Sequence, residues 1–133
     1  MANEFARNIR DAGLIITTFF PAAGVAADSV AFDLVKSDYK PEDFEFEIAW
    51  PTLPDLVDAK TIIFTVQDSA DNSSFTTLEM THTITGAGGV GVAGGSKRFR
   101  LPSNTRRYVN VNHSVLAAAG DNTGKVSTLS LLF

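Results

Sequence analysis

The sequence contains no cysteine, one tryptophan and two histidines. Without cysteine it has no disulfide, no thiolate nucleophile and no zinc site with sulfur ligands. No apolar run reaches the roughly 20 residues of a membrane-spanning helix, so we expect no membrane partner. The formal net charge of -4 lacks the basic surface that binds duplex nucleic acid, so we expect no nucleic-acid partner.

The N-terminal segment resembles an export signal only in part. Two arginines precede an apolar stretch at residues 14–27, as in a signal peptide. However, Glu4 and Asp11 place acid where such a signal is basic, and Pro21 interrupts the apolar stretch. We therefore expect residues 1–26 to be retained as a partly extended arm.

Most of the remaining chain alternates with period two, the pattern of a half-buried β-strand. Phe44, Phe46 and Ile48 fall on one face of such a strand, and Glu45 and Glu47 fall on the other, solvated face. Alternation, or a high content of β-branched and aromatic residues, predicts further strands at residues 29–35, 61–67, 75–85, 98–102, 106–112 and 125–133.

Turn-forming residues separate these strands at regular intervals, and no long helix is predicted. Only residues 4–13 and 114–120 have weak helical character, enough for a turn or two. Short strands without helices are typical of antiparallel sandwiches. We therefore predict an all-β fold, an antiparallel β-sandwich of the jelly-roll type, formed by residues 27–133 as a single domain.

The glycine-rich stretch GAGGVGVAGGSK, residues 86–97, contains the spacing of a dinucleotide-binding loop. Such a loop needs a helix directly after the glycines, because the helix N-terminus supplies the amides that bind phosphate. Here the glycines run into the predicted strand at 98–102. We therefore expect no nucleotide cofactor, and we interpret the stretch as a flexible hairpin loop that can become ordered against a partner.

Other candidate chemistry is weak. Residues 68–79 place some oxygen ligands as in a calcium loop, but Ala70 and Ser73 occupy positions that require a ligand and a glycine, and strands flank the segment. Neither His82, which we expect at the surface or an interface, nor His113 has metal-ligand spacing. No nucleophile motif is present. We expect no metal, no cofactor and no enzymatic activity.

Basic residues cluster on both sides of the turn PSNT: Lys97, Arg98, Arg100, Arg106 and Arg107. One interpretation is the solvated outer face of a hairpin. The other is a basic strip that contacts carboxylates of a neighbouring protein through bidentate ion pairs. The second interpretation makes the four arginines candidate partner-contact residues.

Four segments resemble the small capsid cement proteins of tailed bacteriophages, of the type recognised in a Bordetella phage. They are ADSVAFDL at residues 27–34, TVQDSADNSSFTTL at 65–78, RFRLPSNTRRYVNVN at 98–112 and TGKVSTLSLLF at 123–133. Those proteins similarly run from a strand ending in a Gln-Asp-Ser turn, through a variable glycine loop, to an Arg-Leu-Pro turn and a strand that begins with paired arginines and tyrosine. Residues 1–26 and 40–60 have no counterpart in the resemblance.

The resemblance implies a jelly-roll sandwich that assembles as a homotrimer. Such proteins sit on the outer surface of the icosahedral capsid at three-fold and local three-fold positions, where they bridge subunits of the major capsid protein. The implied location is therefore the virion, after synthesis in the cytoplasm of the bacterial host. A trimer that contacts several subunits at once combines modest contacts into strong binding through avidity, and this needs no catalytic activity.

Three aromatic residues complete the candidate contact sites. Phe19 and Phe20 are either buried in a partner or part of a terminal strand at the edge of the sandwich. Trp50 is a core residue, a subunit contact or, with Tyr39 and Tyr108, a stacking platform for sugars. The alternative functions are therefore a carbohydrate-binding module and a receptor-binding virion component.

Overall fold

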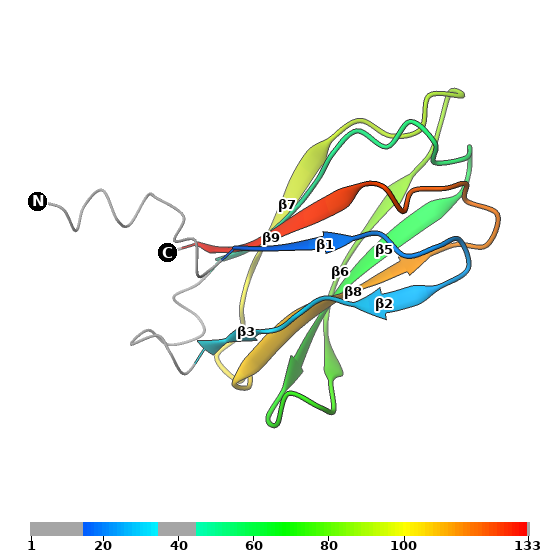
Figure 1. The fold of residues 1–133 in the computed structure, drawn as a ribbon. Helices are drawn as coiled ribbons and strands as arrows, with labels where there is room; N and C mark the ends of the chain where they lie inside the picture. The colour runs from blue at the N-terminus through cyan, green and yellow to red at the C-terminus, as the bar shows by residue number, and fades with distance from the viewer. Residues whose placement is uncertain (1–14, 35–44, 133) are drawn as a thin grey trace, which may run out of the picture.

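Two antiparallel β-sheets pack face to face in the computed structural model (Figure 1). The structure describes residues 15–34 and 45–132, and of residue 132 it describes only the backbone. The first sheet has the strand order β1-β9-β4-β7, and the second has the order β2-β8-β5-β6 with β3 also paired to β8. The strands are β1 (Ile15–Phe19), β2 (Ala26–Asp28), β3 (Phe32–Asp33), β4 (Glu45–Trp50), β5 (Thr61–Ser69), β6 (Thr76–Thr85), β7 (Gly95–Arg100), β8 (Tyr108–Val115) and β9 (Val126–Leu132).

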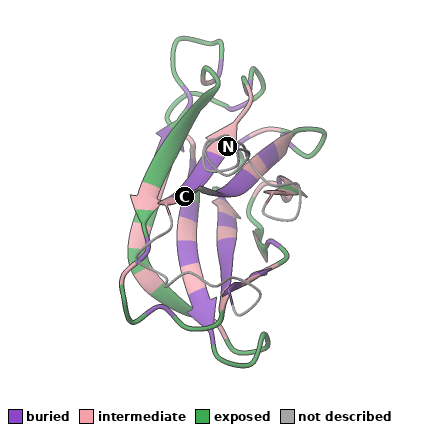
Figure 2. Ribbon diagram, turned by 90° about the vertical axis from the view of Figure 1, so that its left-hand side faces the viewer, coloured by how far each residue is buried: buried purple, intermediate pink, exposed green. Residues whose placement is uncertain are grey.

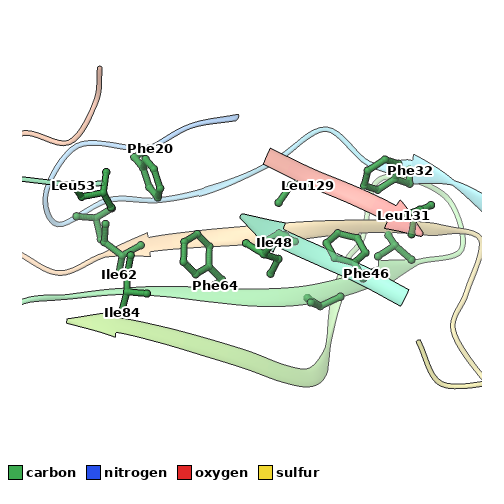
Figure 3. Close-up of a cluster of buried hydrophobic side chains, with 14 of the residues drawn as sticks. Phe20, Phe32, Phe46, Ile48, Leu53, Ile62, Phe64, Ile84, Leu129 and Leu131 are labelled. Atoms are coloured by element: carbon green, nitrogen blue, oxygen red, sulfur yellow. The ribbon is translucent and has the colours of Figure 1, made fainter. Parts of the chain in front are cut away.

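The core lies between the sheets and is formed by the apolar residues of each alternation (Figure 3). Phe46 and Ile48 of β4 point inward opposite Leu131 and Leu129 of β9, and all four are buried. Buried residues occupy the central strands, whereas exposed residues occupy the connecting loops and much of the edge strands β6 and β7 (Figure 2). Removal of these apolar side chains from water is the main stabilising term of a sandwich that has no disulfide.

The predicted all-β antiparallel sandwich is confirmed, and most predicted strands lie within a few residues of the observed ones. The jelly-roll type stays a prediction. The weak helical turn expected at 114–120 is wrong, because β8 continues to Val115 and a turn with Ala118 at a φ of 63° follows. The other helical candidate, residues 4–13, lies outside the described residues.

The first strand lies in a segment that we assigned to an N-terminal arm. Ile15–Phe19 pairs with β9 along its whole length and forms an edge of the first sheet. The sandwich therefore begins before residue 27. Its two β-branched isoleucines and two threonines favour this extended conformation.

Two connections that we expected to be hairpins cross between the sheets instead. The glycine-rich connection leaves β6 in the second sheet and enters β7 in the first, and the turn PSNT then leads back to β8 in the second. Alternation predicts which face of a strand is buried, but it does not say to which of two sheets a strand belongs.

Candidate partner-contact surfaces

Arg98 and Arg100 lie side by side on the outer face of the first sheet, opposite two glutamates of β4. The Arg98 Nε donates to Glu47 Oε2 at 2.9 Å, and its Nη1 lies 3.6 Å from Glu45 Oε2. The Arg100 Nη2 donates to Glu45 Oε1 at 3.2 Å. The exposed fraction of both arginine side chains exceeds one half, whereas that of Glu47 is 5%. This ladder joins β7 to β4.

Arg106 forms a partly buried clamp with Asp68 of β5. Its Nη2 donates to Asp68 Oδ1 at 2.8 Å, and its backbone N–H donates to Asp68 Oδ2 at 2.9 Å. Burial alone would raise the pKa of the Asp68 carboxyl, but these hydrogen bonds outweigh it and lower that pKa below 3.8. The clamp therefore fixes the start of β8 to the end of β5.

Arg107 pairs with Asp33 of β3 in a bidentate geometry. Its Nε and Nη2 donate to the two carboxylate oxygens at 2.9 and 3.0 Å. The guanidinium also lies over the ring of Tyr108, 4.9 Å from the ring centroid, where a cation–π attraction adds to the ion pair. Arg107 thus holds β3 against β8.

The predicted basic strip is therefore divided between the two sheets. Arg98 and Arg100 lie on β7 of the first sheet, whereas Arg106 and Arg107 directly precede β8 and pair with carboxylates of the second sheet. Each of the four pairs with a carboxylate of its own chain. Their role in contacts with a partner stays a prediction, and their intramolecular role is to join neighbouring strands.

Trp50 closes one side of the core. Its ring stacks on Phe64 at 5.7 Å and on His82 at 5.0 Å between ring centroids, and its Nε1 donates to the carbonyl oxygen of Ala93 at 3.1 Å. Tyr108 lies on the outer face of the second sheet, and Tyr39 is outside the described residues. Since Trp50 faces the core and Tyr108 faces outward, the two do not form a common platform for a sugar.

The two adjacent phenylalanines have different environments. Phe20 is 2% exposed and packs edge-on against Phe64 and His113. Phe19 is 67% exposed at the end of β1, opposite Val126. The terminal-strand interpretation therefore holds for Phe20, and Phe19 is the member of the pair that a partner can reach.

The glycine-rich connection is ordered against its own chain, so the hairpin loop that we expected is wrong. Leu53 and Val92 exchange backbone hydrogen bonds of 2.9 and 3.1 Å, and the Gly89 N–H donates to Asp58 at 2.9 Å. Gly91 has a φ of 73°, and a Cβ atom there would overlap the Leu53 carbonyl. The glycines thus permit close approach of two backbones.

The predicted polar turn between β5 and β6 is confirmed, and its carboxylates have protein partners. Asp71 Oδ1 accepts hydrogen bonds from the N–H groups of Ser73 and Ser74, both at 2.9 Å, which lowers the pKa of Asp71 to about 2. Asp68 is held by Arg106. Within residues 15–34 and 45–132, no three histidine, cysteine, aspartate or glutamate side chains are placed to hold a metal ion.

His113 is a core residue that alternation along the strand at 106–112 did not reveal. It is fully buried between the sheets, with Nε2 at 2.6 Å from Ser127 Oγ. Burial lowers its pKa to about 4, against a smaller opposite effect of the Val111 carbonyl and of Asp28. His82 is half-buried under Trp50 and not a free surface residue.

Sequence reasoning named the arginines, Glu45 and Glu47, but it paired none of them and did not identify Asp33 and Asp68 as ion-pair partners. Asp33 lies within the predicted strand at residues 29–35, and Asp68 directly follows the predicted strand at 61–67; a carboxylate is unusual in both places. This was the available signal, because a carboxylate in or beside a buried strand needs an ion-pair partner nearby.

Comparison with known proteins identifies the fold and no family. No protein-family model and no curated protein matches the sequence. Among solved structures, PBSX exported protein XepA has a TM-score of 0.55 at 11% identity over 88% of this chain and 37% of that chain. PirA has a TM-score of 0.49 at 8% identity over 89% and 93%. This chain thus spans little more than a third of XepA, and the likeness concerns the sandwich fold. No helix in the described parts of the chain is long and apolar enough to cross a membrane.

Proposed function

We propose that this chain is a structural virion protein that cements a bacteriophage capsid. It binds the outer surface of the icosahedral shell as a homotrimer and bridges neighbouring subunits of the major capsid protein. The sandwich is of the jelly-roll type and has no catalytic role. XepA, which is related to phage, has a similar fold, and this is compatible with a phage protein.

One observation carries the proposal: two segments that resemble cement proteins form one spatial unit. The Gln-Asp-Ser residues end β5 at Ser69, the paired arginines directly precede β8, and these two strands are hydrogen-bonded neighbours. Asp68 of the first segment and Arg106 of the second, 38 residues apart, form the clamp at their ends. The two motifs therefore depend on each other physically: without the Arg106 side chain the buried Asp68 carboxylate loses its cation, and without the Asp68 carboxylate the backbone N–H of Arg106 loses its acceptor.

The ion pairs and the hydrogen-bonded glycine-rich connection make the sandwich rigid, which suits a protein that acts only by contacting its partners. The ion-paired arginines join neighbouring strands within each sheet, and the glycine-rich connection is hydrogen-bonded to residues 53–60. A rigid module loses little conformational entropy when it binds, so a larger part of the contact energy remains for bridging subunits. A trimer then multiplies these contacts through avidity.

Co-sedimentation with purified shells of the phage that encodes the chain tests this proposal. We expect saturable binding at micromolar concentration, with a plateau that corresponds to one trimer for each three-fold site. Reversal of charge at Arg98 and Arg100 should lower the occupancy more strongly at low than at high salt if these side chains contact the shell. Shells that stay undecorated at every protein concentration would contradict the proposal.

A further inference from the structure

Strand β6 forms an edge of the second sheet that has no partner strand. It pairs with β5 on one side, and no other described strand is hydrogen-bonded to it. The Gly86 N–H donates to the Lys60 carbonyl at 3.0 Å, so in this register Ile84 also bonds to β5, and the backbone groups of the residues between point the other way. The residues that direct their N–H and C=O groups to the free edge are therefore Thr81, Thr83 and Thr85.

This edge lacks the features that ordinarily protect an edge strand. Natural sheets keep their edge strands short, or place charged residues and proline on them, because unpaired backbone groups bind other extended chains. β6 has ten residues with no lysine, arginine or proline, and its one carboxylate, Glu79, lies at the bulge where the pairing with β5 shifts. By contrast, β1 and β2 have five and three residues, and half of β7 is lysine or arginine.

The first sheet extends beyond the free edge of β6. The Ser127 Oγ of β9 lies 2.6 Å from the His113 Nε2 of β8, and Trp50 at the end of β4 stacks on His82 of β6. The next strand of the first sheet beyond β4 is β7, whereas the second sheet ends at β6. A strand added to the free edge would therefore lie opposite β7.

The inner side of β7 is uncovered, as this arrangement requires. Lys97 lies opposite the buried Ile48 across the two strands, so its side chain points to the same inner side of the sheet, yet Lys97 is exposed. Phe99, opposite Phe46, is only half-buried. The Lys97 Nζ lies 5.9 Å from the centroid of the Phe99 ring, and no carboxylate in the described part of the chain pairs with it. One cation and one aromatic ring thus face the place beside β6.

We propose that an extended segment of the major capsid protein adds a strand to the free edge of β6. Its backbone forms about six hydrogen bonds with the three threonines, since each offers one donor and one acceptor. Alternate side chains of the segment face β7 across the gap of about 10 Å between packed sheets. There a carboxylate pairs with Lys97 and an apolar side chain covers Phe99. The inference rests on the proposed capsid-binding role and assigns a surface to it.

Charge favours a partner of different sequence over a second copy of this chain. The inward residues of β6 beyond the bulge are Met80, His82 and Ile84, none of which is a carboxylate. A second β6 at this edge would therefore leave Lys97 unpaired and would bring the Lys97 side chains of both copies into one interface. A segment with alternating carboxylate and apolar side chains complements both Lys97 and Phe99.

Hydrogen exchange of the free protein and of decorated shells tests this inference. Mass spectrometry on peptides that cover residues 80–86 follows the amides of Thr81, Thr83 and Thr85. These amides should exchange rapidly in the free protein and become protected on the shell, with a loss of about three deuterons at short labelling times. The amides between them bond to β5 in both states and should not change.

The edge strand β1 provides the matched control. The Phe20 N–H donates to the Lys125 carbonyl at 3.1 Å, so the Thr17 amide points away from β9 to another free edge. Its exchange should be equal in the two states. Thr83→Pro removes a free-edge donor without breaking a bond to β5 and should raise the dissociation constant for shells about 10-fold, whereas Thr17→Pro should not. Circular dichroism verifies folding, and Lys97→Glu replaces Thr83→Pro if that variant does not fold.

The outcomes separate this inference from the proposed function. Decorated shells on which residues 80–86 exchange as in the free protein would overturn the inference and leave the cement role intact. Equal protection of Thr17 would also overturn it, because the shell would then cover the protein without adding a strand. Protection of residues 80–86 in the free protein at micromolar concentration would show that another copy of the chain occupies the edge. Shells that bind no protein would contradict the proposed function and this inference with it.

Discussion

Acidification from pH 7.5 to 4.5 should destabilise the protein through His113. The fold holds this imidazole neutral, with a pKa of about 4 instead of 6.5. The unfolded chain therefore takes up a proton between these values that the folded chain does not, and the free energy of unfolding falls as the pH falls through this window. The difference corresponds to about 3 kcal/mol when complete, and to between about 2 and 3 kcal/mol at pH 4.5.

The carboxylates do not obscure this effect, because they act at lower pH. Hydrogen bonds hold the pKa values of Asp68 and Asp71 below 3.8 in the fold. Their contribution to stability is present above pH 3.8 and is lost as the pH falls below it. His82 acts in the same window as His113, because burial and the nearby Lys97 also lower its pKa.

Urea unfolding at pH 7.5, 6.0 and 4.5 measures the effect. With a slope of about 1.5 kcal/mol per molar urea for a chain of this size, the wild-type midpoint should fall by between about 1 and 2 M. The variant His113→Gln removes the titrating group, so its midpoint should depend much less on pH, while His82→Gln is the control for the other histidine. Equal pH dependence of His113→Gln and the wild type would refute the assignment of the effect to His113.

Three further predictions compare residues within the fold by urea unfolding at pH 7.5. Gly91→Ala should lower the free energy of unfolding by between about 2 and 4 kcal/mol, because the added Cβ overlaps a backbone carbonyl. Gly89→Ala should lower it by about 1 kcal/mol, because Gly89 has a φ of 74° but open space around it. Equal losses in the two variants would contradict the packing of the loop. Arg106→Gln should cost about 2 kcal/mol, because the buried Asp68 carboxylate loses its cation and keeps only the hydrogen bonds from the backbone N–H of residue 106 and from Thr76. Arg100→Gln, in an exposed pair, should cost less than about 1 kcal/mol; the reverse order would refute the clamp. Phe20→Ala should cost between about 3 and 5 kcal/mol, and a neutral effect would show that this side chain is not in the core.

The strands could be predicted from the sequence because the alternation of apolar and polar residues shows which side chains of a strand are buried. Phe46 and Ile48 face the core as their spacing requires, and the turn after Asp68 forms where the polar residues cluster. A strand at Ile15–Phe19 was only one of two interpretations of this segment, the other being an arm that is buried in a partner. The two could not be separated because these residues lie in an apolar run without a clear period. Local patterns therefore gave the elements and most of their faces.

The pairing of elements across the chain could not be predicted in the same way. The clamp between Asp68 and Arg106 depends on β5 lying beside β8, and the stack of Trp50 on His82 depends on the packing of one sheet on the other. Both are long-range contacts.

The cement role predicts that the protein strengthens the shell it binds. Purified shells, stripped of the protein and then incubated with or without it, are heated while the release of packaged DNA is followed with an intercalating dye. We expect decorated shells to release DNA at a higher temperature, with the increase saturating at one trimer for each three-fold site. Shells that bind the protein at these sites but rupture at the same temperature as stripped shells would contradict the central claim.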